Sequence, residues 1–78
     1  MKIYVGNLSE QVSDRSLAQA FEPFGRVASA ETVKEHGSGA TRGFGYVEMP
    51  DATEAQSAID SLNGQELQGK RLMVQSSI

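Results

Sequence analysis

Two short segments of the chain alternate aliphatic residues with residues of other kinds. In 2–6 (KIYVG), the aliphatic side chains point to one side of an extended chain and Tyr4 points to the other. The octamer 42–49 (RGFGYVEM) has the same period of two, with Phe44 and Tyr46 on one side and aliphatic residues on the other. We therefore predict two β-strands, each with an aliphatic core face and an aromatic face.

A helical period follows the first of these segments. Leu17, Phe21 and Phe24 are spaced i, i+4 and i+7, which predicts one apolar stripe of a helix. Ser13 is a favourable N-cap for this helix, because its hydroxyl can accept a hydrogen bond from a backbone N–H of the first turn. Gly25 is expected to end the helix as a left-handed C-cap.

A second helix is expected directly after the octamer. Asp51 and Glu54 form a capping-box-like start, and Asn63 with Gly64 stops the helix. Its apolar stripe comprises Ala55, Ala58, Ile59 and Leu62.

The remaining sequence completes a four-stranded pattern. Residues 26–35 and 71–75 are predicted strands, and Leu67 adds a short extra strand. Residues 36–41 are predicted to be a glycine-rich hairpin loop that is mobile without ligand. The order is βαββαβ over a single domain, residues 1–78. We therefore expect an α+β sandwich of the ferredoxin-like type, with a four-stranded antiparallel sheet and both helices on one face.

The aromatic faces of the predicted strands carry the main functional signal. If both helices cover the aliphatic face, then Tyr4, Phe44 and Tyr46 lie on a sheet face that meets water. Flat exposed rings beside Arg42 are suited to stacking on unpaired bases, an interaction worth about 1–3 kcal/mol per base. The sequence therefore predicts a surface for single-stranded nucleic acid.

Two motifs resemble the RNA recognition motif (RRM) family. The octamer 42–49 matches its pattern of basic, Gly, aromatic, Gly or Ala, aromatic, aliphatic, any residue and aromatic, except that Met49 takes the last position. Residues 3–8 (IYVGNL) match the hexamer of the family, on an earlier strand and in the expected order. The resemblance covers essentially the whole chain, which also looks similar to the stand-alone RRM proteins of cyanobacteria and other bacteria.

The resemblance implies a role for each residue of the motifs. Tyr4 and Phe44 would each stack under one base, and Tyr46 would pack against sugars between two nucleotides. Arg42 would pair with phosphate. The implied ligand is single-stranded RNA, about two to four nucleotides of it, bound in the course of post-transcriptional RNA handling.

Further residues extend the candidate RNA-binding site. The set is completed by Asn7, Arg71, Met73 and Gln75. Asn7 either contacts a nucleotide or caps the end of its strand. Glu31 is expected on the same open face, where it would either repel phosphate or accept a hydrogen bond from the amino group of a base.

The net charge of −3 is unusual for a nucleic-acid module, which normally carries a basic surplus. The expected strands and their ends hold six basic against three acidic residues, whereas the rest of the chain holds one basic against seven acidic. Acidic residues are therefore concentrated away from the proposed face. We expect few phosphate contacts, micromolar or weaker affinity and a shallow salt dependence, with about one to three ions released.

Composition limits the other classes of function. The chain has no cysteine and its single histidine, His36, lies in the glycine-rich loop, so neither a metal site nor a catalytic site is expected. No cofactor is expected, because 37–39 (GSG) lacks the Lys and the context of a phosphate-binding loop. No apolar run approaches the roughly 20 residues of a membrane helix. We expect a cytoplasmic monomer that is not an enzyme and does not bind membranes.

Two other partners stay open as alternatives. Members of the RRM family can bind proteins, often through the helical face and usually when the aromatic residues of the sheet are degraded. The three rings of this chain argue against that function. Stacking does not distinguish RNA from DNA, so single-stranded DNA is the second alternative, and contact with the 2′-hydroxyl would separate the two.

Overall fold

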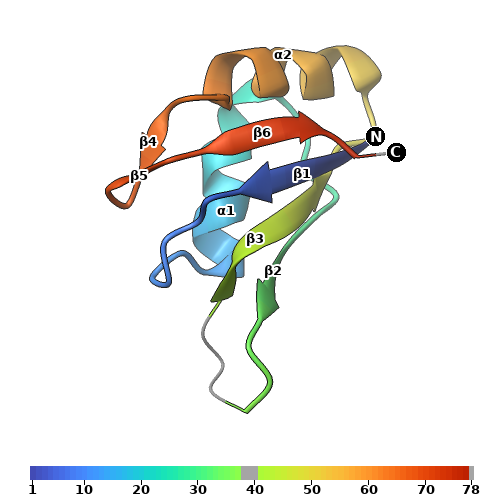
Figure 1. Ribbon diagram of the computed structural model, residues 1–78. Coiled ribbons are helices and arrows are strands. Elements are labelled where there is room, and N and C mark those ends of the chain that lie inside the picture. Colours follow the sequence, from blue (N-terminus) through green and yellow to red (C-terminus); the bar gives the residue numbers. More distant parts are fainter. Residues whose placement is uncertain (38–40, 78) are drawn as a thin grey trace.

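The computed structural model describes residues 1–37 and 41–77 of the chain (Figure 1). The α-helices and strands follow the predicted βαββαβ order, with a short 3₁₀-helix, η1, and a small hairpin added. The elements are β1 (Lys2–Gly6), α1 (Asp14–Phe21), η1 (Glu22–Phe24), β2 (Ser29–Lys34), β3 (Thr41–Glu48), α2 (Ala52–Leu62), β4 (Glu66–Leu67), β5 (Lys70–Arg71) and β6 (Met73–Ser76).

The main sheet has four antiparallel strands in the order β2-β3-β1-β6. Helices α1 and α2 lie on the same side of it (Figure 1), so the predicted ferredoxin-like α+β sandwich is confirmed. The core between the layers joins the aliphatic face of the sheet to both helices. Its buried residues are Ile3, Val5, Leu8, Val12, Leu17, Phe21, Val47, Met49, Ala55, Ala58, Ile59, Leu72 and Val74.

Both helices begin where the sequence predicts. The Ser13 hydroxyl accepts a hydrogen bond from the backbone N–H of Ser16 at 3.1 Å, and the Asp51 carboxylate accepts one from the backbone N–H of Glu54 at 3.0 Å. The capping box of α2 is incomplete, because the Glu54 carboxylate accepts a hydrogen bond from the backbone N–H of Arg26 at 3.2 Å. This side chain therefore joins α2 to the segment that leads into β2.

The prediction of a left-handed C-cap at Gly25 is wrong. Helix α1 ends at Phe21, and η1 carries the chain on through Pro23. Gly25 has φ 153° and ψ −166°, which is outside the left-handed helical region. An added Cβ at this position would collide with the side chain of Glu54. Gly25 is therefore favoured both by its positive φ and by the close approach of the Glu54 side chain.

The final strand is shorter than predicted. Strand β6 begins at Met73, whereas Arg71 lies in β5, which pairs with β4. The predicted extra strand at Leu67 is confirmed as β4. Gln68 and Gly69 connect β4 and β5 with φ values of 53° and 83°, a turn that suits the twist of a two-residue hairpin.

Two further predictions concern the β2–β3 region. Strand β2 covers Ser29–Lys34 and is shorter than the predicted 26–35, and its register with β3 shifts between Thr32 and Lys34. The prediction of a mobile loop over 36–41 falls mainly on 38–40, which lie outside the described residues.

Among the described residues, no helix is long and apolar enough to cross a membrane.

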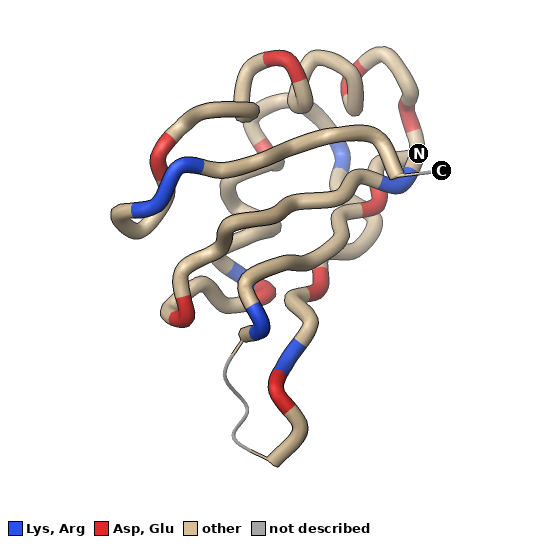
Figure 2. The backbone as a smooth tube through the Cα atoms, in the orientation of Figure 1, with Lys and Arg blue, Asp and Glu red and all other residues tan. Residues whose placement is uncertain are grey.

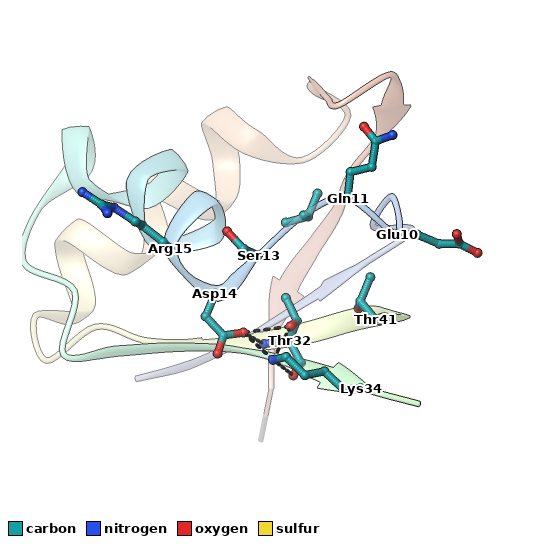
Figure 3. A pocket seen from close by; sticks show the side chains of 9 residues that line it. Glu10, Gln11, Ser13, Asp14, Arg15, Thr32, Lys34 and Thr41 are labelled. Carbon is teal, nitrogen blue, oxygen red and sulfur yellow. Dashed lines mark hydrogen bonds and ion pairs between the residues drawn. The ribbon is translucent and has the colours of Figure 1, made fainter. Parts of the chain in front are cut away.

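Asp14 connects the first turn of α1 to β2 (Figure 3). Its carboxylate accepts hydrogen bonds from the backbone N–H and the hydroxyl of Thr32, both at 2.7 Å, and from Nζ of Lys34 at 2.9 Å. The backbone hydrogen bond from Thr32, followed by that from Lys34, lowers the pKa of Asp14 from 3.8 to about 2. These bonds lie in a hollow of about 380 Å³ between the β1–α1 loop and the sheet.

We predict that Asp14→Asn lowers the free energy of unfolding by about 1 kcal/mol at pH 7, after allowance for solvent screening of a half-exposed carboxylate. Because the folded-state pKa is depressed, this stabilisation is complete above pH 4 and is lost as the pH falls towards 2. Urea unfolding of both proteins between pH 2 and 7 measures the difference. Glu10→Gln, an exposed carboxylate in the preceding loop, is the control and should keep the wild-type pH dependence.

Candidate nucleic-acid interface

The sheet face opposite the helices is built from cross-strand rows of side chains. Tyr4 pairs with Tyr46 on one side and with Gln75 on the other, and Tyr46 pairs with Glu31. Directly paired residues of a sheet share a face, so these four form a row across all four strands. Three of the four residues are predicted site residues, and Glu31 lies on the open face as expected.

Two more rows flank the first. In one, Gly6 pairs with Met73 and with Phe44, and Met73 is 58% exposed. In the other, Glu48 pairs with Lys2 and with Ser29. We call the surface formed by these three rows the open face. Its members are Lys2, Tyr4, Gly6, Ser29, Glu31, Phe44, Tyr46, Glu48, Met73 and Gln75.

The three aromatic rings of the open face form one cluster. The centroids of Tyr4 and Phe44 are 6.0 Å apart with an interplanar angle of 28°, whereas Tyr46 lies 5.9 Å from Tyr4 and 6.2 Å from Phe44 in edge-on arrangements. All three side chains are half-buried, because each ring shields its neighbours. The rings of Tyr4 and Phe44 are nearly parallel, an orientation suited to stacking of two unpaired bases.

Gly6 forms the floor beneath the Tyr4 ring. An added Cβ at Gly6 would lie 2.7 Å from Oη and 2.9 Å from Cε2 of Tyr4. The ring of Tyr4 therefore lies along β1 towards Phe44, which is the residue paired with Gly6. Sequence reasoning did not assign this role, although Gly6 has the same strand parity as Tyr4.

The two glycines of the octamer allow the conformation and packing of the backbone of β3. Gly45 is buried, and an added Cβ would lie 2.5 Å from the carbonyl oxygen of Glu31 on β2. Gly43 has φ 96°, a value that disfavours other residues, and its carbonyl accepts a hydrogen bond from the backbone N–H of Leu8 at 2.8 Å. Gly45 therefore allows β2 to approach β3 closely, whereas Gly43 is favoured by its positive φ.

The remaining predicted residues lie around one end of the open face, next to Phe44. The side-chain amide of Asn7 donates a hydrogen bond to the carbonyl of Arg71 at 2.7 Å, and Asn7 has φ 59°. This arrangement supports the structural role of Asn7, because its side chain fixes the β4–β5 hairpin at the end of β1. The exposed guanidinium of Arg42 has Nε 4.0 Å from Oε1 of Glu35, a weak ion pair that leaves the cation accessible.

Charge is distributed unevenly over the open face (Figure 2). Glu48 and Lys2 lie in the row farthest from Arg42, and Glu31 lies on β2 in the central row. The ammonium of Lys2 lies 4.6 Å from the ring centroid of Tyr46, a cation–π contact. A shallow hollow of about 320 Å³ opens here, which we call the edge hollow. It is lined by Lys2, Ser29, Glu31, Tyr46, Val47 and Glu48.

The described residues contain no group of three or more His, Cys, Asp or Glu side chains that could hold a metal ion. His36 is exposed beyond the end of β2. The structure therefore offers the aromatic cluster and the edge hollow as the chemical features of the open face.

The proteins that this chain resembles agree with a nucleic-acid interface on the open face. The sequence profile of the RNA recognition motif covers residues 3–73. Over 73 residues the chain is 45% identical to glycine-rich RNA-binding protein 1 of Mycosarcoma maydis, and over 76 residues it is 43% identical to the chloroplastic 31 kDa ribonucleoprotein of Nicotiana plumbaginifolia. These alignments cover 94% and 97% of this chain but only 42% and 26% of the two relatives.

Solved structures agree with the sequence comparison. The crystal structure of RNA binding protein PG1 is similar with a TM-score of 0.95 and 41% identity, covering 100% of this chain and 94% of that one. The Sxl-lethal protein in complex with RNA is similar with a TM-score of 0.92 and 26% identity, over 99% of this chain and 46% of that one. Because the profile match includes both motif strands and nearly the whole sequence, the chain belongs to the RNA recognition motif family.

Proposed function

We propose that the domain binds single-stranded RNA on its open face, with base stacking on Tyr4, Phe44 and Tyr46 as the main interaction. The observation that carries the proposal is the aromatic cluster itself, with three half-exposed rings whose centroids lie within 6.2 Å of one another. Membership of the RNA recognition motif family and the printed names of the relatives support RNA as the ligand.

Each ring has a position that suits one part of an RNA strand. Tyr4 and Phe44 are inclined by only 28°, so two successive bases can each lie on one ring. Tyr46 stands edge-on to both rings and would contact the sugars between those bases. Arg42 lies beyond Phe44 and can pair with phosphate, while Gln75, next to Tyr4, can donate to or accept from a base edge.

The oligomeric state, the cellular compartment and the biological process stay predictions. Action as a monomer in a bacterial cytoplasm rests on the sequence alone, and the relatives named above come from a fungus and from plant chloroplasts. The chain spans less than half of either relative, so an assignment to post-transcriptional RNA handling is a proposal for the domain. Binding to single-stranded DNA or to a protein would be detected in the experiments below.

We predict that replacing Tyr4, Phe44 and Tyr46 together with Ala removes detectable binding to short single-stranded RNA. Each lost stacking interaction costs about 1–3 kcal/mol, whereas the half-exposed rings contribute little to the core. Fluorescence anisotropy with RNA and DNA of the same sequence measures the effect, and circular dichroism checks the fold.

The matched control is the double variant Tyr4→Phe, Tyr46→Phe. It keeps all three rings and should retain most of the affinity. Unchanged RNA binding by the triple alanine variant would refute a binding site on the open face. If a protein ligand instead changed the chemical shifts of residues in α1 and α2 of this domain, the protein-binding alternative would be supported.

We predict a shallow salt dependence of RNA affinity. With about one to three phosphates neutralised, the slope of log K against log salt is about −0.7 to −2 for a single strand. Titrations between 50 and 300 mM KCl, roughly the range in which such slopes are measured, provide the test. Arg42→Gln should reduce the slope by about 0.7, and a slope steeper than about −4 would contradict a mode of binding based on stacking.

We predict that Gly6→Ala weakens RNA binding several-fold without unfolding the domain. The added methyl group displaces the Tyr4 ring from its place beside Phe44, while Ala is well tolerated in an extended strand. In a double-mutant cycle, Gly6→Ala should have no further effect when Tyr4 is already Ala, since the ring it displaces is absent. Full additivity of the two changes would contradict the role of Gly6 as the floor of the ring.

A further inference from the structure

The edge hollow is the part of the open face that stacking on the aromatic cluster leaves unused. It lies beside Tyr46, at the β2 end of the row that runs from Gln75 through Tyr4 and Tyr46 to Glu31. We propose that Glu31 determines base specificity there and selects guanine at the nucleotide next to Tyr46. This proposal rests on the RNA-binding function proposed above.

The position of Glu31 suits contact with a base edge. Its backbone is directly paired with that of Tyr46, so the two side chains lie roughly 5 Å apart at Cβ on the same face. Glu31 is exposed, and among residues 1–37 and 41–77 the ion pairs join Lys34 with Asp14 and Arg42 with Glu35 only. The carboxylate therefore keeps its acceptor positions available for a ligand within the described surface.

Guanine is the base whose edge complements this carboxylate. Its N1–H and N2–H donors are adjacent and parallel, so both can bind the two oxygens of one carboxylate, as an Arg guanidinium does. Uracil presents a single N–H between two carbonyl oxygens, and the carboxylate repels those oxygens. Adenine and cytosine each present an amino group beside a ring nitrogen that is itself an acceptor.

The charges around the hollow favour the same orientation. Glu48 pairs with Ser29 one row from Glu31, so two carboxylates face the hollow and repel a phosphate placed there. A nucleotide beside Tyr46 must then direct its base, and not its phosphate, towards β2. Lys2, whose ammonium lies over the Tyr46 ring, supplies a donor in the same hollow for the guanine O6 acceptor.

The test compares guanosine with inosine, which lacks only the N2 amino group. Uridine pentamers carrying one guanosine, inosine, adenosine or cytidine at each position in turn are titrated into the wild type and into Glu31→Gln. The matched control is Glu22→Gln, which removes the same charge from η1, an element that contributes nothing to the open face. Backbone chemical shifts locate the preferred nucleotide relative to Tyr46.

At one position, the wild type and Glu22→Gln should bind the guanosine pentamer about tenfold more tightly than the inosine pentamer. In Glu31→Gln this ratio should fall to about twofold or less, while the all-uridine pentamer, which the carboxylate repels, loses no affinity. The proposal is overturned if the ratio is unchanged in Glu31→Gln. It is also overturned if every pentamer is bound more tightly by the same factor, since uniform tightening indicates phosphate repulsion. Failure of the wild type to bind any pentamer would instead refute the RNA-binding function itself.

Discussion

The pairing register between β1 and β3 decides which side chains of the sheet enter the core and which lie on the open face. Ile3 lies opposite Val47 and Tyr4 lies opposite Tyr46, so one register places aliphatic residues in the core and aromatic residues on the open face. A shift by one residue would exchange the two faces and bury the tyrosines against the helices. The stability of the core therefore fixes the arrangement of the rings, although the rings contribute little to it.

The space left by two glycines is the second condition for this surface. Gly6 leaves room for the ring of Tyr4, and Gly45 lets the carbonyl of Glu31 approach β3. Asp14 also connects α1 by hydrogen bonds to β2, the strand that carries Glu31. The residues that shape the open face thus include several that would not touch a ligand, because they position the strands and rings that do.

The charges differ between the two ends of the open face. Arg42 lies at the end near Phe44, whereas Glu48 and Lys2 lie at the other end and line the edge hollow together with Glu31. In an acidic domain, attraction to phosphate is limited, and stacking with selective hydrogen bonding must supply more of the affinity. A surface of this kind is suited to discriminating between bases more than to binding any polyanion.

Local sequence was enough to predict the order of elements, the two helix N-caps and the three rings of the open face. These features follow from local periodicity and from short motifs, which act within a few residues. The folded chain was needed to reveal the packing around Gly25, the exclusion of Arg71 from the final strand, the floor beneath Tyr4 and the edge hollow. Each of these depends on which distant segments meet, because the contact of Gly25 with Glu54 and the pairing of Glu31 with Tyr46 are set by helix packing and strand register.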